Sequence, residues 1–264
     1  MVAASLLIAK GAHAVPVSSN PEADAEMKLV FLGTRGEIEK RTRRHRMHSS
    51  LLVSQKSARI VIDCGADWLG RAGNWDADAI LLTHAHRDHA YGLSRGAPCP
   101  VYATADTWDR IDAYPIRDRR LIHERRPVDV GPLRIEAFAV EHSLRAPAVG
   151  YRVSSGKVFF YVPDVVAIPE CGAALRGVAL YIGDGATIAR AIRRKRGNAL
   201  IGHAAIRTQL DWCREAGVGA AIFTHCGSQI VGGDEDVVAP LVRRLGREHR
   251  VSARLAYDGL SVEL

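Results

Sequence analysis

Short apolar runs recur along the chain from residue 27 onward, and most of them end at an acidic residue or a histidine. Apolar runs of roughly four to eight residues between polar stretches are typical of buried β-strands. Strands are therefore predicted at residues 27–33, 60–62, 79–83, 137–141, 158–163, 179–183 and 220–224. In α/β folds, ligands bind beyond the carboxyl ends of the strands. The pattern predicts such a fold, with a site where these polar side chains meet.

Helices are predicted between the strands, because several stretches carry the residues that begin and end helices. Thr104 is a candidate N-cap, and Gly197 and Gly217 are candidate C-terminal glycines. The last stretch has acidic residues first and basic residues late, as the helix dipole favours. The predicted helices cover residues 104–114, 186–196, 204–216 and 234–248. Strands with interspersed helices indicate an α/β architecture.

The densest group of reactive side chains is His84-Ala85-His86-Arg87-Asp88-His89, directly after the apolar run 79–83. In an extended segment, His84 and His86 point to the same side because they are two residues apart. Imidazole and carboxylate groups suit zinc, manganese or iron(II), and the cluster is dense enough for two ions. The alternative is a polar loop that is rich in histidine by chance. Further candidate ligands at the ends of other predicted strands argue against that alternative.

The pattern His-x-His-x-Asp-His after an apolar strand resembles the metal-binding signature of the metallo-β-lactamase-fold hydrolases. The resemblance covers about residues 27–264 and implies one domain, an αββα sandwich of two facing mixed β-sheets with helices outside. It implies two divalent ions, Zn²⁺ or Mn²⁺, with an activated hydroxide between them. The first ion would be bound by His84, His86 and His142, the second by Asp88, His89 and His225, with Asp164 bridging both.

Three further residues gain a role from this resemblance, and Asp88 gains a catalytic role beside its metal ligation. Asp63 matches an acid that orients a ligand histidine; the alternative is a strand-ending turn carboxylate. His203 matches the histidine that protonates the leaving oxygen in the branch of ribonuclease Z and cyclic phosphodiesterases. Asp184 matches an acid that would hold the His203 ring in position. The alternative for His203 is that it caps or packs a helix.

The chain also departs from both named activities of that branch. It has no long arm rich in glycine and proline of the kind that binds transfer RNA, and residues 33–50 contain no cysteine for a structural zinc site. We therefore expect a phosphodiesterase whose substrate is a cyclic nucleotide or a nucleic-acid phosphodiester. The alternative is a carboxyl ester, thioester or lactone hydrolase, which would not need His203. A non-catalytic nucleic-acid-binding protein is a third hypothesis, and the complete ligand set argues against it.

The charge balance is consistent with an anionic substrate. The net charge is +7, and basic residues cluster at 40–46 and 190–196. Both clusters could contact phosphates, although a solvated basic face explains them equally well. Aromatic residues make up only 6% of the chain, so a stacking groove for single strands is not predicted. No apolar run reaches the roughly 18 residues that a membrane span needs, so no membrane partner is predicted; a homodimer is allowed.

The start of the chain and its cysteines complete the prediction. Residues 1–26 are polar over much of their length and are expected to form a disordered extension before a hydrolase domain at 27–264. The segment resembles a signal peptide only weakly, since positive charge is missing before its apolar run. The five cysteines form no C-x-x-C pair, which favours a reducing compartment and a cytoplasmic location.

Overall fold

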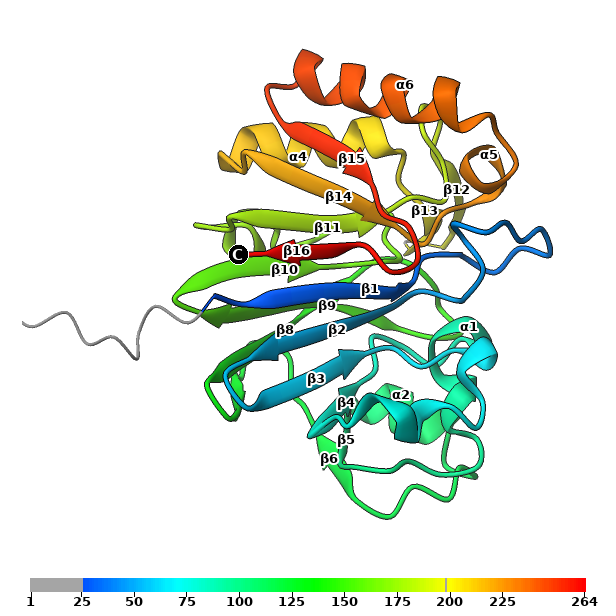
Figure 1. The fold of residues 1–264 in the computed structure, drawn as a ribbon, viewed down its shortest axis with the longest axis vertical. Coiled ribbons are helices and arrows are strands. Elements are labelled where there is room, and N and C mark those ends of the chain that lie inside the picture. Colours follow the sequence, from blue (N-terminus) through cyan, green and yellow to red (C-terminus); the bar gives the residue numbers. More distant parts are fainter. Residues whose placement is uncertain (1–25, 198) are drawn as a thin grey trace, which may run out of the picture.

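The structure is a computed structural model that describes residues 26–197 and 199–264, and its centre is a pair of β-sheets packed face to face (Figure 1). The expected disorder of residues 1–26 lies outside the described residues except at Glu26. Helices cover the outer face of each sheet, with α4 (Ile206–Ala216) and α6 (Glu235–Glu248) over one of them and α1 (Arg87–Ala90) and α2 (Ala105–Arg110) beside the other. The predicted αββα sandwich is confirmed.

The first sheet has seven strands in the order β16-β1-β2-β3-β4-β5-β6. Pairing is antiparallel from β16 to β3 and parallel from β3 to β6. The strands are β1 Lys28–Gly33, β2 Ser50–Gln55, β3 Ala58–Ile62, β4 Ala79–Leu81, β5 Val101–Ala103, β6 Arg119–Leu121 and β16 Ser261–Glu263.

The second sheet also has seven strands, in the order β15-β14-β11-β10-β9-β8-β7. Pairing is parallel from β15 to β10 and antiparallel from β10 to β7. The strands are β7 Val128–Val130, β8 Leu133–Val140, β9 Ala148–Ser155, β10 Lys157–Tyr161, β11 Leu180–Asp184, β14 Ala220–Thr224 and β15 Ser252–Leu255.

Alternation along the strands separates the layers. In β1, Leu29 and Phe31 are buried between the sheets, whereas Val30 and Leu32 pack toward the outer helices. In β10, Phe159 joins the core between the sheets and Phe160 joins the core under α4 and α6. Successive side chains of a strand point to opposite faces, so a strand with apolar residues at both positions is buried on both sides. This explains why the central strands read as continuous apolar runs.

The helices confirm most of the helix predictions. Thr104 caps α2 by accepting a hydrogen bond from the Thr107 amide, and Gly217 ends α4 in the left-handed conformation. The helix predicted at 104–114 ends earlier, at Arg110. The helices are α1 Arg87–Ala90, α2 Ala105–Arg110, α3 Cys171–Ala174, α4 Ile206–Ala216, α5 Ser228–Val231 and α6 Glu235–Glu248, with 3₁₀ turns η1 Ala66–Trp68, η2 Ala72–Trp75 and η3 Tyr91–Leu93.

The helix predicted over residues 186–196 is wrong. The segment ends in strand β12 (Ile192–Arg196), which forms a two-stranded sheet with β13 (Ala199–His203). Side chains divert the preceding backbone from helical hydrogen bonding: Asp184 accepts from the Ala186 amide, and the Thr187 hydroxyl donates to the Arg190 carbonyl. A helix would also place the arginines at spacings of three and four residues on one face, where they repel one another.

None of the helices in the described part of the chain has the length and apolar character needed to cross a lipid bilayer. All five cysteines are free thiols, and three of them are buried.

Close packing at Gly65 ties the end of β3 to the segment that carries Asp88. A Cβ on Gly65 would lie 1.8 Å from the Asp88 carbonyl oxygen, and the neighbouring Cys64 amide donates to the His89 carbonyl at 2.7 Å. Any larger residue at Gly65 has to push these two segments apart.

We expect Gly65→Ala to lower the free energy of unfolding by roughly 1–3 kcal/mol, since overpacking against backbone cannot be relieved by a side-chain rotation. Gly73→Ala is the matched control, because a Cβ at Gly73 would meet nothing within 4 Å. Thermal melts of both variants check this. A Gly65→Ala protein with the melting temperature of the wild type contradicts it.

Candidate metal centre

Strand ends from both sheets meet at one edge of the sandwich. His84 follows β4, His142 follows β8, Asp164 follows β10 and His225 follows β14. The short helix α1 begins right after His86 and turns the chain. The turn brings the rest of the six-residue motif, Asp88 and His89, to the same edge.

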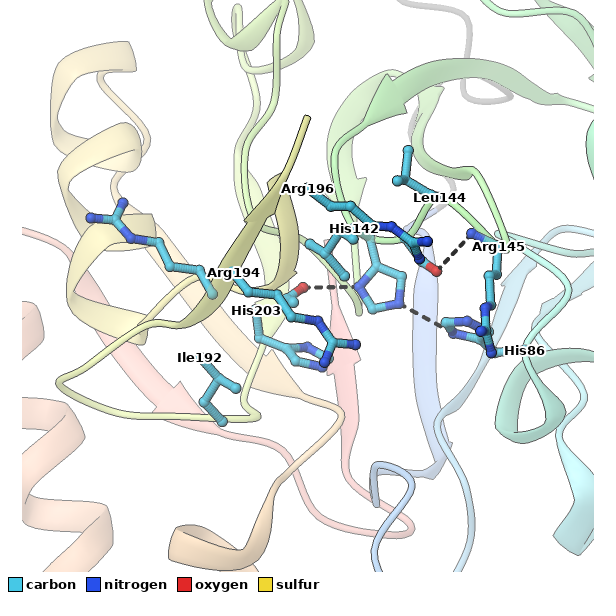
Figure 2. A pocket seen from close by; sticks show the side chains of 12 residues that line it. His86, His142, Leu144, Arg145, Ile192, Arg194, Arg196 and His203 are labelled. Atoms are coloured by element: carbon cyan, nitrogen blue, oxygen red, sulfur yellow. Dashed lines mark hydrogen bonds between the residues drawn. The ribbon is translucent and has the colours of Figure 1, made fainter. Parts of the chain in front are cut away.

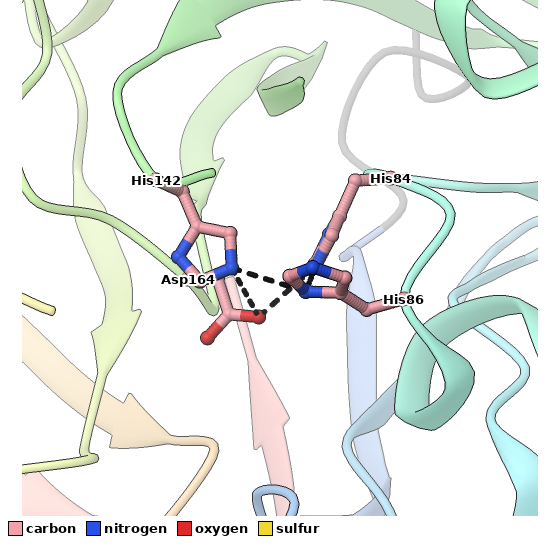
Figure 3. A group of neighbouring side chains, drawn as sticks. All are labelled: His84, His86, His142 and Asp164. Carbon is pink, nitrogen blue, oxygen red and sulfur yellow. Dashed lines mark hydrogen bonds and ion pairs between the residues drawn. The ribbon is translucent and has the colours of Figure 1, made fainter. Parts of the chain in front are cut away.

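One quartet of side chains consists of His84, His86, His142 and Asp164, with ligand atoms within 4.8 Å of one another (Figure 3). His86 Nδ1 lies 2.9 Å from His84 Nε2 and 3.2 Å from His142 Nε2. The Asp164 carboxylate lies 3.3 Å from His84 Nε2.

A second quartet consists of Asp88, His89, Asp164 and His225 and shares Asp164 with the first. His89 Nε2 lies 2.9 Å from Asp164 Oδ2 and 3.3 Å from Asp88 Oδ2. His225 approaches Asp88 through Nε2 and Asp164 through Nδ1, each at 3.0 Å. All four residues are buried.

Hydrogen bonds behind the rings determine which nitrogens face inward. His89 Nδ1 donates to Asp63 at 2.9 Å, and His142 Nδ1 donates to the Gly202 carbonyl at 2.9 Å. The Thr83 hydroxyl donates to Asp63 and therefore accepts from His84 Nδ1 at 3.0 Å. Each of these three rings therefore turns Nε2 toward the cluster, so that this nitrogen is the one available to a metal once it carries no proton.

These residues fit divalent metal ions. His89 Nε2, His225 Nδ1 and Asp164 Oδ1 are buried and have no hydrogen-bond partner in the structure. His89 Nε2 and His225 Nδ1 lie 2.9 Å and 3.0 Å from oxygens of the Asp164 carboxylate, but neither contact has the geometry of a hydrogen bond. The inward Nε2 lone pairs of His84 and His142 both face His86 Nδ1, which carries at most one proton. A cation among these atoms would satisfy all of them at once.

The pKa values of the histidines fall into two groups. Burial lowers the pKa of His84 well below its usual range and lowers that of His86 to about 4, so both rings are neutral at neutral pH. Burial also disfavours charge on His225, but Asp164 and its neighbours outweigh this and raise the pKa of His225 to about 9. The carboxylates likewise raise the pKa of His89 well above its usual range. Metal binding at the second quartet would therefore displace protons.

His203 lies beside both quartets at the end of β13. Its Nδ1 donates to Asp184 Oδ2 at 2.8 Å and lies 3.3 Å from Asp164 Oδ1. Burial lowers its pKa, but Asp184 and Asp164 prevail and raise the pKa of His203 to about 11. Asp164, Asp184, His203 and His225 also form a third group that could hold a metal. The ring is 22% exposed and borders two cavities next to the quartets.

Some residues that hold this site had no clear signal in the sequence. The Thr83 hydroxyl connects Asp63 to His84, and Gln209 of α4 accepts from the Asp184 amide and donates to the Asp184 carbonyl. The only available signal for Gln209 was a polar residue on the apolar face of a predicted helix. Arg145 was also missed, although it borders one of the cavities (Figure 2).

Comparison with known families agrees with this arrangement. The profile described as "Beta-lactamase superfamily domain" matches residues 58–226, which contain every residue of both quartets. The chain belongs to the metallo-β-lactamase superfamily. The resemblance seen in the His84–His89 motif thus extends through the last quartet residue, His225.

The individual relatives of this chain differ widely from it in sequence. Ribonuclease Z of Methanopyrus kandleri is 33% identical over 155 residues, which cover 51% of this chain and 53% of that enzyme, so the chain spans about half the length of this relative. The YhfI protein of Bacillus subtilis has a TM-score of 0.72 at 18% identity, covering 91% of this chain and 100% of its own. Zn²⁺-bound PqqB of Methylobacterium extorquens has a TM-score of 0.68 at 20% identity, covering 90% and 100%. These two structures establish the shared fold.

We expect Asp63→Asn to weaken metal retention about 10–100-fold, because loss of a partner behind a ligand histidine has effects of that size. The Asp63 carboxylate accepts from the Thr83 amide, the Thr83 hydroxyl and His89 Nδ1, whereas an amide side chain must present a donor to one of them. Asp109→Asn, at an exposed position of α2, is the control. Competition with a chromogenic chelator measures both; equal affinities, with melting temperatures unchanged, would refute the role of Asp63.

Proposed function

We propose that this protein is a dinuclear metal-dependent phosphodiesterase that binds Zn²⁺ or Mn²⁺. The observation that carries the proposal is the combination of two quartets sharing Asp164 with a histidine, His203, held against Asp184 at their border. In this proposal the first ion is bound by His84, His86, His142 and Asp164, and the second by Asp88, His89, Asp164 and His225. Imidazole and carboxylate donors suit both metals. The ribonuclease Z relative supports the phosphodiester class.

Two bound ions would supply a hydroxide nucleophile at neutral pH and would polarise the phosphoryl oxygens. The chain's own residues do the rest. The hydrogen bonds that the rings donate to Asp63, Thr83 and the Gly202 carbonyl keep three rings oriented, so the ligands need not reorganise when substrate binds. Asp88 faces the cavity that contains His203, and in this proposal it also has a catalytic role, accepting the proton of the attacking water.

His203 is the proposed general acid. Asp184 fixes its Nδ1–H, so the other edge of the ring is left for the substrate side of the cavities. Cleavage of a phosphodiester places negative charge on the leaving oxygen, and a proton from His203 would stabilise it. A carboxyl ester or lactone hydrolase would use the same metal ligands without needing this proton. The position of His203 therefore favours phosphodiesters over that alternative.

The proposal predicts about two metal ions per chain after mild purification without chelators. It also predicts that the protein hydrolyses bis-p-nitrophenyl phosphate and at least one of a cyclic nucleotide or a short RNA, and prefers them to a lactone. Elemental analysis and a substrate panel test this together. A metal-free protein that no added ion activates would exclude the enzyme, and a preference for the lactone would move the assignment to carboxyl esters.

For His203→Ala, we expect both metals to be retained and kcat to fall roughly 10²–10⁴-fold on a substrate with an alkoxide leaving group. The loss on a p-nitrophenyl ester should be much smaller, because p-nitrophenolate leaves readily without a proton. Asp184→Asn should show a milder version of the same pattern. His123→Ala, at an exposed position remote in sequence from the motif, is the control.

Steady-state kinetics on both substrate types, with metal analysis of each variant, separates the outcomes. Equal losses on good and poor leaving groups would exclude His203 as the general acid. Loss of metal would instead make His203 a ligand in the third group of side chains.

A further inference from the structure

A cavity of about 570 Å³ adjoins the metal centre on the side of His203 (Figure 2). The β12–β13 hairpin forms one wall and the loop after β8, including Leu144 and Arg145, forms the other. His86, His142 and His203 border it where it meets the quartets. This volume is typical of a small-molecule site and is more than a single phosphate group needs.

The cavity carries an excess of positive charge. Four arginines line it, Arg145, Arg193, Arg194 and Arg196, and no acidic residue of the described chain lines it with them. Within the described residues, none of these guanidinium groups forms an ion pair with a carboxylate, whereas other arginines do, among them Arg35, Arg41, Arg120 and Arg214. Like charges that share a concave surface repel one another. Guanidinium groups bind phosphate through paired hydrogen bonds, so an anion would relieve this repulsion.

The register of the hairpin places two of these arginines in line with His203. His203 pairs with Ile192, and Arg194 pairs with Ile201. Cross-strand partners share a face and so do alternate residues of one strand, so Arg194 and Arg196 lie on the face that carries His203. At a rise of 3.3 Å per residue, they are about 7 Å and about 13 Å along the strand from the level of His203. Arg193 and Lys195 lie on the opposite face; Arg193 still reaches the cavity at its edge, whereas Lys195 does not line it.

We infer that the leaving group of the substrate carries a second phosphate, which Arg194 and Arg196 bind with Arg145 facing them. This rests on the proposed function: if His203 protonates the leaving oxygen, the leaving group lies beyond His203, where the arginines are. The exposed side chains of Leu144 and Ile192 border the same cavity and offer apolar contacts to a sugar or base. The substrate class is a phosphodiester whose leaving side is a phosphorylated nucleoside, either free or at the end of a strand.

The alternative is a solvated basic surface that attracts any polyanion. General attraction would depend on the total charge of the hairpin, so Lys195 would contribute as much as Arg194 or Arg196. Recognition inside the cavity would depend on the two arginines of the His203 face and not on Lys195. The chain thus provides its own control, since all three substitutions remove one charge from the same exposed strand.

The kinetic test compares the dinucleotide UpU with pUpU and UpUp, using the metal-loaded enzyme at fixed salt. Chromatography of the products identifies the leaving nucleoside. We expect a terminal phosphate on that nucleoside to raise kcat/KM about tenfold, as a charge-assisted contact can. Arg194→Ala and Arg196→Ala should each remove most of this gain, and Lys195→Ala should keep it. Equal kcat/KM for UpU and the phosphorylated forms would overturn the inference.

A binding test does not depend on turnover. Isothermal titration should show that uridine 3′,5′-bisphosphate binds more tightly than uridine 5′-monophosphate, and that Arg194→Ala removes the difference while Lys195→Ala does not. If neither UpU nor bis-p-nitrophenyl phosphate is hydrolysed, the proposed function fails. The titration still shows, independently of hydrolysis, whether Arg194 helps to bind a second phosphate. Equal losses in Arg194→Ala and Lys195→Ala, or a gain seen only with longer strands, would assign the charges to a solvated surface and overturn the inference.

Discussion

The charge of Asp164 is the constraint on which the rest of the site depends. Its carboxylate is 3% exposed and lies within 4 Å of ring nitrogens from five histidines: His84, His89, His142, His203 and His225. A buried carboxylate is strongly unfavourable unless positive charge or donors surround it. These histidines come from four segments of the chain: the His84–His89 motif, the end of β8, the end of β13 and the end of β14. The burial of one carboxylate therefore requires that all of these segments keep their positions together.

The two sheets provide that positioning through strand direction. Strands β10, β11 and β14 run parallel, so their carboxyl ends deliver Asp164, Asp184 and His225 to one edge. Two antiparallel pairings separate β8 from β10, so β8 ends at that edge as well and delivers His142. The parallel pair β3 and β4 brings Asp63 and His84 from the other sheet. The inward orientation of the rings then follows from hydrogen bonds to rigid backbone and buried acids.

The hairpin of β12 and β13 differs from this rigid edge. All residues of β12 are exposed, and the hairpin reaches the metal centre through Gly202 and His203 at the end of β13. If the proposed function holds, the reacting groups lie on buried strand ends, and the choice of leaving group lies on an exposed arm. Substitutions in β12 would then alter substrate preference without disturbing the buried ligands, because the contacts with the ligands come from Gly202 and His203 of β13. Such a division between scaffold and selective surface is common in enzymes.

The sequence by itself determined seven of the sixteen strands and an α/β architecture, because a buried strand is marked by local apolar pattern. The two facing sheets and the set of residues that meet at their edge followed from the resemblance that the His84–His89 motif carries, and the parallel strands do bring their ends together there. The tertiary structure alone decided that residues 192–196 pair as a strand, that Gln209 holds Asp184, and that Arg145 faces the hairpin. These depend on side-chain contacts between segments far apart in the chain, which no local pattern encodes.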